Sequence, residues 1–163
     1  MLVVENGDGL PNATTYLSVD EADAYHDMRA NSAWYEADLP AKEAALVKAT
    51  EYLDTRYYAR WKGWRRTKDQ ALEWPRVDVW DESGYIITDI PQRLKDATAE
   101  AALRALDEEL APDYGRESVV TRETVGPVTV QYRGDAPTSR RYPAVEHRLA
   151  GLLRPAGLKV VRG

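Results

Sequence analysis

The residues with the clearest chemical potential lie in one short basic segment near the middle of the chain. Between Arg56 and Lys68 there are six Lys or Arg side chains and no acid. The aromatic rings interleaved with these cations are Tyr57, Tyr58, Trp61 and Trp64. Cations bind phosphates and exposed rings stack on unpaired bases, each stacked base contributing about 1–3 kcal/mol. This combination is typical of single-stranded nucleic acid binding, for which the candidate residues are Trp61, Lys62, Trp64, Arg65 and Arg66.

The same segment has two other interpretations. The tryptophans could pack into the core while the Lys and Arg stems lie over them. Tyr57 favours this reading, because it falls on the apolar stripe of the helix expected just before the segment. Trp and Arg also dominate the energetics of protein–protein interfaces. The pattern alone therefore leaves packing, a protein interface and nucleic acid binding open.

Catalytic and metal-binding motifs are missing from the sequence. There is no Cys, and the two histidines, His26 and His147, lie near opposite ends of the chain. Asp20, Asp23 and Asp27 share one face of an expected helix, where paired carboxylates could do acid–base work or hold a cation. A solvated helix face explains them more simply, and zinc sites need three or four ligands. We expect no enzyme activity, no metal and no cofactor.

Composition limits the kind of protein further. The 163 residues include 27 acids and 22 Lys or Arg, so the net charge is −5. Proteins that coat nucleic acid usually carry a basic face and a high pI, which makes this balance awkward for such a role. No stretch approaches the roughly 20 apolar residues that span a bilayer. We expect a soluble protein without a membrane partner.

Local signals predict the helices of the first half. Ser18 and Glu21 fit a capping box, which begins a helix over 19–30 with Ala22, Tyr25 and Met28 or Arg29 on its apolar face. Asp38 and Pro40 begin a second helix that ends near residue 58. Its apolar stripe comprises Ala45, Leu46, Ala49, Tyr52, Leu53 and Tyr57. The three- and four-residue steps of this stripe indicate an amphipathic helix.

The second half mixes helical and extended patterns. Thr67 and Gln70 fit another capping box, so a short helix should follow and stop before Trp74-Pro75. Segment 77–87 reads as a small hairpin or an extended loop. Pro91 opens a helix to about residue 110, apolar on two sides and therefore expected at the centre of the bundle. Val- and Thr-rich runs on either side of Gly126-Pro127 predict a β-hairpin.

These elements predict a mostly α fold, a small bundle of about four helices with a β-hairpin in its C-terminal third and extended terminal arms. We expect one domain over 1–163, divided into an arm (1–17), the bundle (18–112), the hairpin (117–133), a last helix (142–153) and a tail (154–163). The apolar face of the last helix would carry Val145, Leu149, Leu152 and Leu153.

Several segments, taken in order, resemble a family of tailed-phage proteins. They include Asn6-Gly7-Asp8-Gly9-Leu10-Pro11, Trp61-Lys62-Gly63, Glu73-Trp74-Pro75-Arg76, Val125-Gly126-Pro127 and Tyr142-Pro143. The likeness spans roughly residues 4–153. Members are described either as head–tail connectors, also called adaptors or head completion proteins, or as DnaT-like single-stranded-DNA-binding proteins. The resemblance implies a helical bundle with a β-hairpin and supplies no catalytic residues.

Between these two descriptions we prefer the adaptor, because a net charge of −5 suits a ring through which DNA slides without sticking. The resemblance then implies a virion protein made in the bacterial cytoplasm and placed at the head–tail neck. Its expected partners are the phage portal protein, neighbouring copies in a twelve-subunit ring and the next tail-completion protein, with packaged DNA passing through the bore. The expected portal-binding residues are Tyr142, Pro143, Leu149, Leu153, Leu158, Val160 and Val161. The alternative is single-stranded DNA binding through segment 56–68.

Overall fold

The computed structural model describes residues 2–111, 122–125, 128–131 and 141–155, and the chain divides into two compact units. One unit combines Met1–Leu110 with Tyr142–Gly163, and the other is Ala111–Arg141. The smaller unit holds the antiparallel strands β3 (Arg122–Val125) and β4 (Val128–Gln131), paired so that Val125 lies opposite Val128. The predicted β-hairpin is therefore confirmed.

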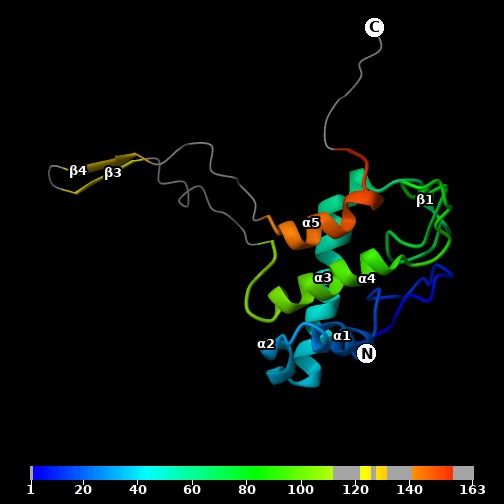
Figure 1. Ribbon diagram of the computed structural model, residues 1–163, viewed down its shortest axis with the longest axis horizontal. Coiled ribbons are helices and arrows are strands. Elements are labelled where there is room, and N and C mark those ends of the chain that lie inside the picture. The colour runs from blue at the N-terminus through cyan, green and yellow to red at the C-terminus, as the bar shows by residue number, and fades with distance from the viewer. Residues whose placement is uncertain (1, 112–121, 126–127, 132–140, 156–163) are drawn as a thin grey trace, which may run out of the picture. The chain divides into compact units, whose positions relative to one another are not determined.

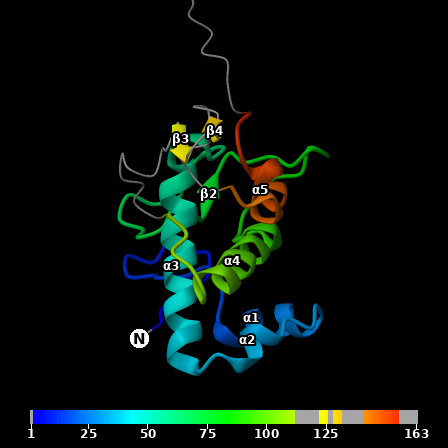
Figure 2. The same cartoon turned by 90° about the vertical axis from the view of Figure 1, so that its left-hand side faces the viewer.

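The larger unit is a helical bundle built around one long helix (Figure 1). Its helices are α1 (Val19–Asp27), α2 (Ser32–Glu36), α3 (Leu39–Tyr57), α4 (Gln92–Ala105) and α5 (Pro143–Leu149). Helix α4 crosses α3 and packs against it, and α5 packs against α4 (Figures 1 and 2). Helices α1 and α2 lie at the N-terminal end of α3. The predicted fold class, a small mostly helical bundle with a β-hairpin, is confirmed.

Helix α1 begins as predicted but ends early. The Ser18 hydroxyl accepts a hydrogen bond from the Glu21 amide, and the Glu21 carboxylate accepts one from the Ser18 amide. The chain leaves the helix after Asp27, and Ala30 adopts a left-handed backbone with φ of +51°. Met28, expected on the buried face, consequently lies in solvent with 78% of its surface exposed.

Helix α2 has no counterpart among the predicted elements. It places Trp34 in the core, where the indole donates a hydrogen bond to Asp23 at 2.6 Å and packs on the His26 ring, with 4.5 Å between the centroids and 34° between the planes. The five residues of this helix are too few for a periodic apolar pattern. Burial of one large ring holds it in place instead.

The pairing of α3 with α4 forms the centre of the core. Asp38 caps α3 by accepting the Ala41 amide at 2.9 Å, as predicted. Helix α4 ends at Ala105 rather than near residue 110, and its buried face is mostly small: Leu94, Ala97, Thr98, Ala99, Ala101, Ala102 and Ala105. Small side chains let neighbouring helices approach closely and pack densely. The prediction of a central core helix over this segment is confirmed in its position and burial.

The C-terminal part of the bundle returns to the end of α3. Helix α5 and the 3-10 turn η3 (Ala150–Leu152) bury the apolar side chains predicted for the last helix, namely Val145, Leu149, Leu152 and Leu153. Leu153 then forms an antiparallel bridge with Trp61, and the Arg154 amide donates to the Arg60 carbonyl at 2.7 Å. Two segments more than 90 residues apart in sequence are thereby joined.

The N-terminal arm is folded around one buried carboxylate. Glu5 accepts hydrogen bonds from the amides of Gly7 and Gly9 at 2.9 Å and from the amide of Leu10 at 2.8 Å. Gly7 and Gly9 have φ of +98° and +82°, a conformation that glycine adopts without steric cost. This segment of the arm thus forms a closed loop, called the Glu5 loop below (residues 5–10).

Between α3 and α4 the chain forms tight turns and a very short ladder. Strands β1 (Trp64–Arg65) and β2 (Arg76–Val77) pair antiparallel, with Trp64 opposite Val77. The capping box expected at Thr67 and Gln70 makes both of its hydrogen bonds, yet no helix follows. The side-chain Nε2 of Gln70 instead donates to the carbonyls of residues 72 and 75, which turns the chain back toward β1. Farther on, an antiparallel bridge between residues 80 and 86 confirms a small hairpin in segment 77–87.

Candidate nucleic-acid interface

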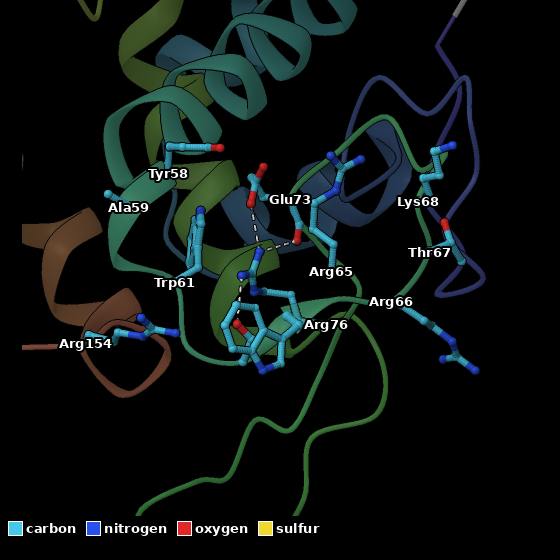
Figure 3. A pocket seen from close by; sticks show the side chains of 12 residues that line it. Tyr58, Ala59, Trp61, Arg65, Arg66, Thr67, Lys68, Glu73, Arg76 and Arg154 are labelled. Carbon is cyan, nitrogen blue, oxygen red and sulfur yellow. Dashed lines mark hydrogen bonds and ion pairs between the residues drawn. The ribbon is translucent and has the colours of Figure 1, made fainter.

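An open groove of about 560 Å³ lies beside the β1–β2 ladder (Figure 3). Its lining combines rings, cations and one acid: Tyr58, Trp61, Trp64, Arg65, Arg66, Lys68, Glu73, Arg76 and Arg154, with Ala59, Gly63 and Thr67 between them. The short turn η1 (Tyr58–Arg60) after α3 supplies one wall, and the ladder and its loop supply the other. In Figure 3, Arg154 lies on one side of the groove and Lys68 on the other.

The four aromatic rings of the basic segment divide into two buried and two exposed. Trp61 is 1% exposed and meets Tyr57 and Trp74 edge to face at 6.0 and 6.1 Å between centroids. Tyr58 and Trp64 are 70% and 66% exposed. The packing interpretation therefore holds for Trp61 and Tyr57, and Trp61 cannot stack on a base. The rings available to a ligand are Tyr58 and Trp64.

The cations around the groove differ in how many of their donors are already in use. Arg65 donates to the Gln70 carbonyl, and Arg66 donates to the carbonyls of residues 7 and 88 at 3.1 and 3.2 Å. Within the described residues, Lys68 makes no hydrogen bond or ion pair. Lys62, a sequence candidate, is turned to the Gly151 carbonyl at 2.7 Å and does not line the groove.

Arg154 is the groove residue that sequence reasoning missed. Its guanidinium carbon lies 6.0 Å from the centroid of the Trp64 ring, and its carbonyl accepts hydrogen bonds from the Arg60 side chain at 3.3 and 3.4 Å. A cation near an indole face is attracted to the ring. No sequence signal near residue 154 points to segment 56–68, because the two segments meet only in the tertiary structure, through the bridge between Leu153 and Trp61 and the hydrogen bonds between Arg60 and Arg154.

The groove is positive although the whole chain is negative. Five cations and one carboxylate, Glu73, line it, so its formal charge is +4 against −5 for the chain. Glu73 is paired with Arg76 at 2.7 Å. Four cations are left to act on a ligand: Arg65, Arg66, Lys68 and Arg154. The net charge of the chain therefore does not indicate whether it can bind phosphates, since phosphate binding depends on the local distribution of charge.

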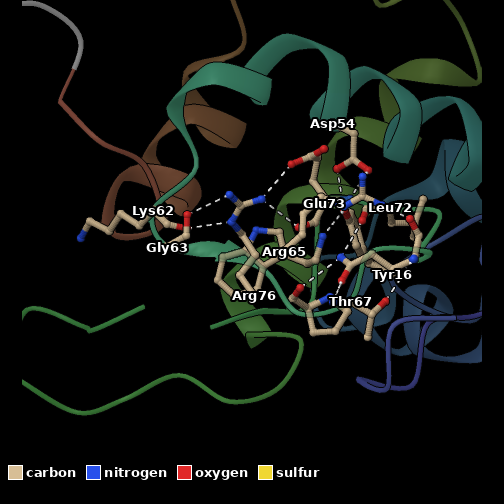
Figure 4. A network of polar contacts seen from close by, with 12 residues as sticks. Tyr16, Asp54, Lys62, Gly63, Arg65, Thr67, Leu72, Glu73 and Arg76 are labelled. Atoms are coloured by element: carbon tan, nitrogen blue, oxygen red, sulfur yellow. Dashed lines mark hydrogen bonds and ion pairs between the residues drawn. The ribbon is translucent and has the colours of Figure 1, made fainter. Parts of the chain in front are cut away.

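A buried polar network supports the groove from behind (Figure 4). The Tyr16 hydroxyl donates to Asp54 at 2.5 Å and accepts the Trp74 amide at 3.2 Å, while Asp54 also accepts the Glu73 amide at 3.0 Å. Burial raises the pKa of the Asp54 carboxyl to about 6 and raises the pKa of the Tyr16 hydroxyl well above its usual range. The network fixes the backbone at residues 73 and 74, just before β2.

Of the expected portal-binding residues that the structure describes, most are buried. Tyr142, Leu149 and Leu153 are buried in the core, and the Tyr142 ring packs edge to face on Tyr52 at 5.8 Å. Pro143 is exposed but occupies the first turn of α5. The remaining three, Leu158, Val160 and Val161, lie outside the described residues. An amphipathic pattern marks a buried face, and here the bundle itself buries it.

The acidic face of α1 holds structural contacts. Asp23 forms an ion pair with Lys42 at 2.9 Å in addition to its bond from Trp34, and these bonds lower its pKa against the opposing effect of burial. His26 is buried beside Trp34, and burial lowers its pKa. In the part of the chain that the structure describes, no group of three or more potential metal ligands comes together. Among the helices of these residues, none has the length and hydropathy of a transmembrane span.

Comparison with known proteins decides between the two family descriptions. A family model described as "Putative DnaT-like ssDNA binding protein" matches residues 1–163. Searches of curated proteins and of solved structures gave no significant match. The match overturns the assignment to a phage head–tail connector, and with it the portal protein, the subunit ring and the tail-completion protein as partners. The virion location stays a prediction. It was inferred from the adaptor role, which the family match contradicts. The chain belongs to the DnaT-like ssDNA-binding protein family.

Proposed function

We propose that this protein binds single-stranded DNA in the groove beside the β1–β2 ladder, without catalysing a reaction. The observation that carries the proposal is the placement of Trp64, a tryptophan 66% exposed with the Arg154 guanidinium beside its ring. Exposing an indole to water is unfavourable unless a ligand covers it, and an unpaired base offers a flat face of matching chemistry. Membership of the family supports the same ligand.

The two exposed rings and the cations would have separate tasks. Trp64 and Tyr58 stack on bases, whatever their identity, because every base has a π face. Lys68 and Arg154 bind phosphates, with Arg65 and Arg66 adding to the local field. Duplex DNA presents its phosphates but not its base faces, so it can use the cations and not the rings. Binding should therefore prefer a single strand and tolerate many sequences.

Fluorescence anisotropy with a labelled oligo-dT, at low and at moderate salt, tests this proposal. Binding should weaken as salt rises, with a slope of log affinity against log salt of about −0.7 for each phosphate contact. Trp64→Ala should lower the affinity about 5- to 150-fold, since one stacked base contributes about 1–3 kcal/mol. A duplex of equal length should bind more weakly and be insensitive to this substitution.

Trp80→Ala is the matched control. Trp80 is also a surface tryptophan, 54% exposed, but it does not line the groove. The control should bind oligo-dT like the wild type. Equal losses in the two variants would show that the groove is not the site, and absence of binding by the wild type at micromolar protein would refute the proposed function.

A further inference from the structure

The position of the Trp64 ring depends on the turn that precedes it. Gly63 has φ of +64°, and a side chain there would begin 2.1 Å from the carbonyl oxygen of Val77. The turn formed by Lys62 and Gly63 is therefore pressed against β2, and it leads directly into Trp64 at the start of β1. Whatever fixes this turn fixes the direction in which the ring leaves the backbone.

One guanidinium holds this turn from inside the molecule (Figure 4). Arg76 donates from Nε to the Lys62 carbonyl at 2.7 Å and from Nη2 to the Gly63 carbonyl at 3.0 Å. Its Nη1 donates to the carbonyl and the carboxylate of Glu73 at 3.1 and 2.7 Å. The planar fork of an arginine can meet several acceptors at fixed angles, which a lysine ammonium cannot do.

These bonds also leave Arg76 little capacity to hold a ligand. Its side chain is 8% exposed, and all three of its nitrogen atoms already donate to protein oxygens. The Glu73 carboxylate neutralises its charge at 2.7 Å. Arg76 thus borders the groove without presenting a free positive group to a phosphate.

We propose that Arg76 is a positioning residue, whose guanidinium holds the turn before Trp64 and thereby sets where that ring projects into the groove. The inference rests on the proposed function for its effect on DNA, but the placement of the ring can be measured without DNA. It predicts that the shape of the fork at residue 76 matters to stacking, while its charge does not contribute to phosphate binding.

Arg76→Lys tests the proposal because it keeps the charge and removes the fork. Oligo-dT affinity should fall about tenfold, because a misplaced ring keeps some of the affinity that one fully stacked base contributes. The slope of log affinity against log salt should stay within about 0.3 of wild type, because no phosphate contact is lost. In the free protein, the indole N–H resonance of Trp64 should move in a ¹H–¹⁵N spectrum, identified among the five tryptophan signals by its absence in Trp64→Phe.

Two outcomes would overturn the proposal. A slope shallower by about 0.7 would mean that Arg76 itself contacts a phosphate. Unchanged affinity together with an unmoved Trp64 resonance would mean that the fork does not place the ring. Arg104→Lys is the control, since it makes the same change, with the charge kept and the fork removed, at an arginine that pairs with Glu100 at 2.9 Å outside the groove. It should leave both readouts as in the wild type.

Glu73→Gln keeps the test decisive if Arg76→Lys does not fold. This variant removes the charge that neutralises Arg76 but leaves its bonds to three backbone carbonyls. The Trp64 resonance and the salt slope should both stay as in the wild type. A slope steeper by about 0.7 would show Arg76 released to a phosphate and would refute its positioning role. If the wild type fails to bind oligo-dT, the proposed function fails, while the Trp64 resonance in Arg76→Lys still decides the positioning claim.

Discussion

Glu5→Gln should destabilise the protein strongly although it replaces one oxygen by one nitrogen. The buried carboxylate accepts the amides of Gly7 and Gly9 on Oε1 and the amide of Leu10 on Oε2. In the variant the carboxamide oxygen can keep the first two, but the NH₂ group then faces the Leu10 N–H donor to donor. The loss comprises one hydrogen bond to a charged acceptor, worth about 1.5–3 kcal/mol, and a buried donor left without a partner. We expect a total cost of about 2–4 kcal/mol.

Urea unfolding of wild type, Glu5→Gln and Asp8→Asn would measure this cost. Asp8 lies in the same loop and undergoes the same chemical change, but its carboxylate is exposed and, among the described residues, bonds only the Asn6 side chain, at 2.8 Å. Substitutions at such sites usually change stability by less than about 0.5 kcal/mol. A Glu5→Gln midpoint equal to that of Asp8→Asn would refute the view that the carboxylate organises the loop.

The Glu5 loop also connects to the groove. The Gly7 carbonyl accepts a hydrogen bond from Arg66 at 3.1 Å, and a side chain at Gly9 would meet the Thr67 hydroxyl at 2.9 Å. Amide hydrogen exchange in Glu5→Gln should therefore speed up at residues 66–70 as well as in the loop. Faster exchange confined to residues 5–10 would show that the two segments are not coupled.

Two further substitutions test the assignment of individual side chains. Trp61→Ala should lower the free energy of unfolding in urea by about 3–5 kcal/mol, because the Trp61 ring is buried. Trp64→Ala should change it by less than about 0.5 kcal/mol, because the Trp64 ring is exposed. Similar losses in the two variants would contradict the division into a core ring and a surface ring. Burial raises the pKa of Asp54 in the folded protein to about 6, from an ordinary 3.8. The folded state therefore binds this proton more tightly than the unfolded chain, which stabilises the fold below pH 4. That stabilisation is lost as the pH rises from 4 to 6. The stability of wild type relative to Asp54→Asn should accordingly fall by about 3 kcal/mol at most between pH 4 and 7, and a difference independent of pH would contradict the raised pKa.

The preference for the adaptor role failed for an identifiable physical reason. It relied on the net charge of −5, which sums over the whole surface. Acids on α1 are used in structural contacts such as the Lys95–Glu21 pair at 2.6 Å and the Lys42–Asp23 pair, while the groove carries +4. A phosphate responds to nearby charges, because at 0.15 M salt those beyond about 8 Å are largely screened. The basic segment was therefore a better guide to the family than the total charge.

The features of this protein that could be predicted from its sequence are those that depend on interactions between residues close together in the chain. The caps at Ser18 and Asp38 fixed where α1 and α3 begin, because capping hydrogen bonds join residues three apart. The apolar periodicity of α4 and α5 fixed their buried faces, and the Val-rich runs around residues 126–127 fixed the hairpin. The sequence also located the basic aromatic segment that lines the groove.

Contacts between distant parts of the chain determine which side chains of that segment are exposed. Trp61 and Trp64 have the same chemistry and lie three residues apart, yet the bridge to Leu153 buries one and the ladder with β2 exposes the other. The capping box of Thr67 and Gln70 forms its local hydrogen bonds although no helix follows. The Gln70 side chain donates instead to the carbonyls of residues 72 and 75, where the chain turns back. Arg154 lies beside Trp64 because the segment after α5 packs against the segment after α3, more than 90 residues earlier in the chain. Such contacts depend on long-range chain closure, which no local pattern encodes.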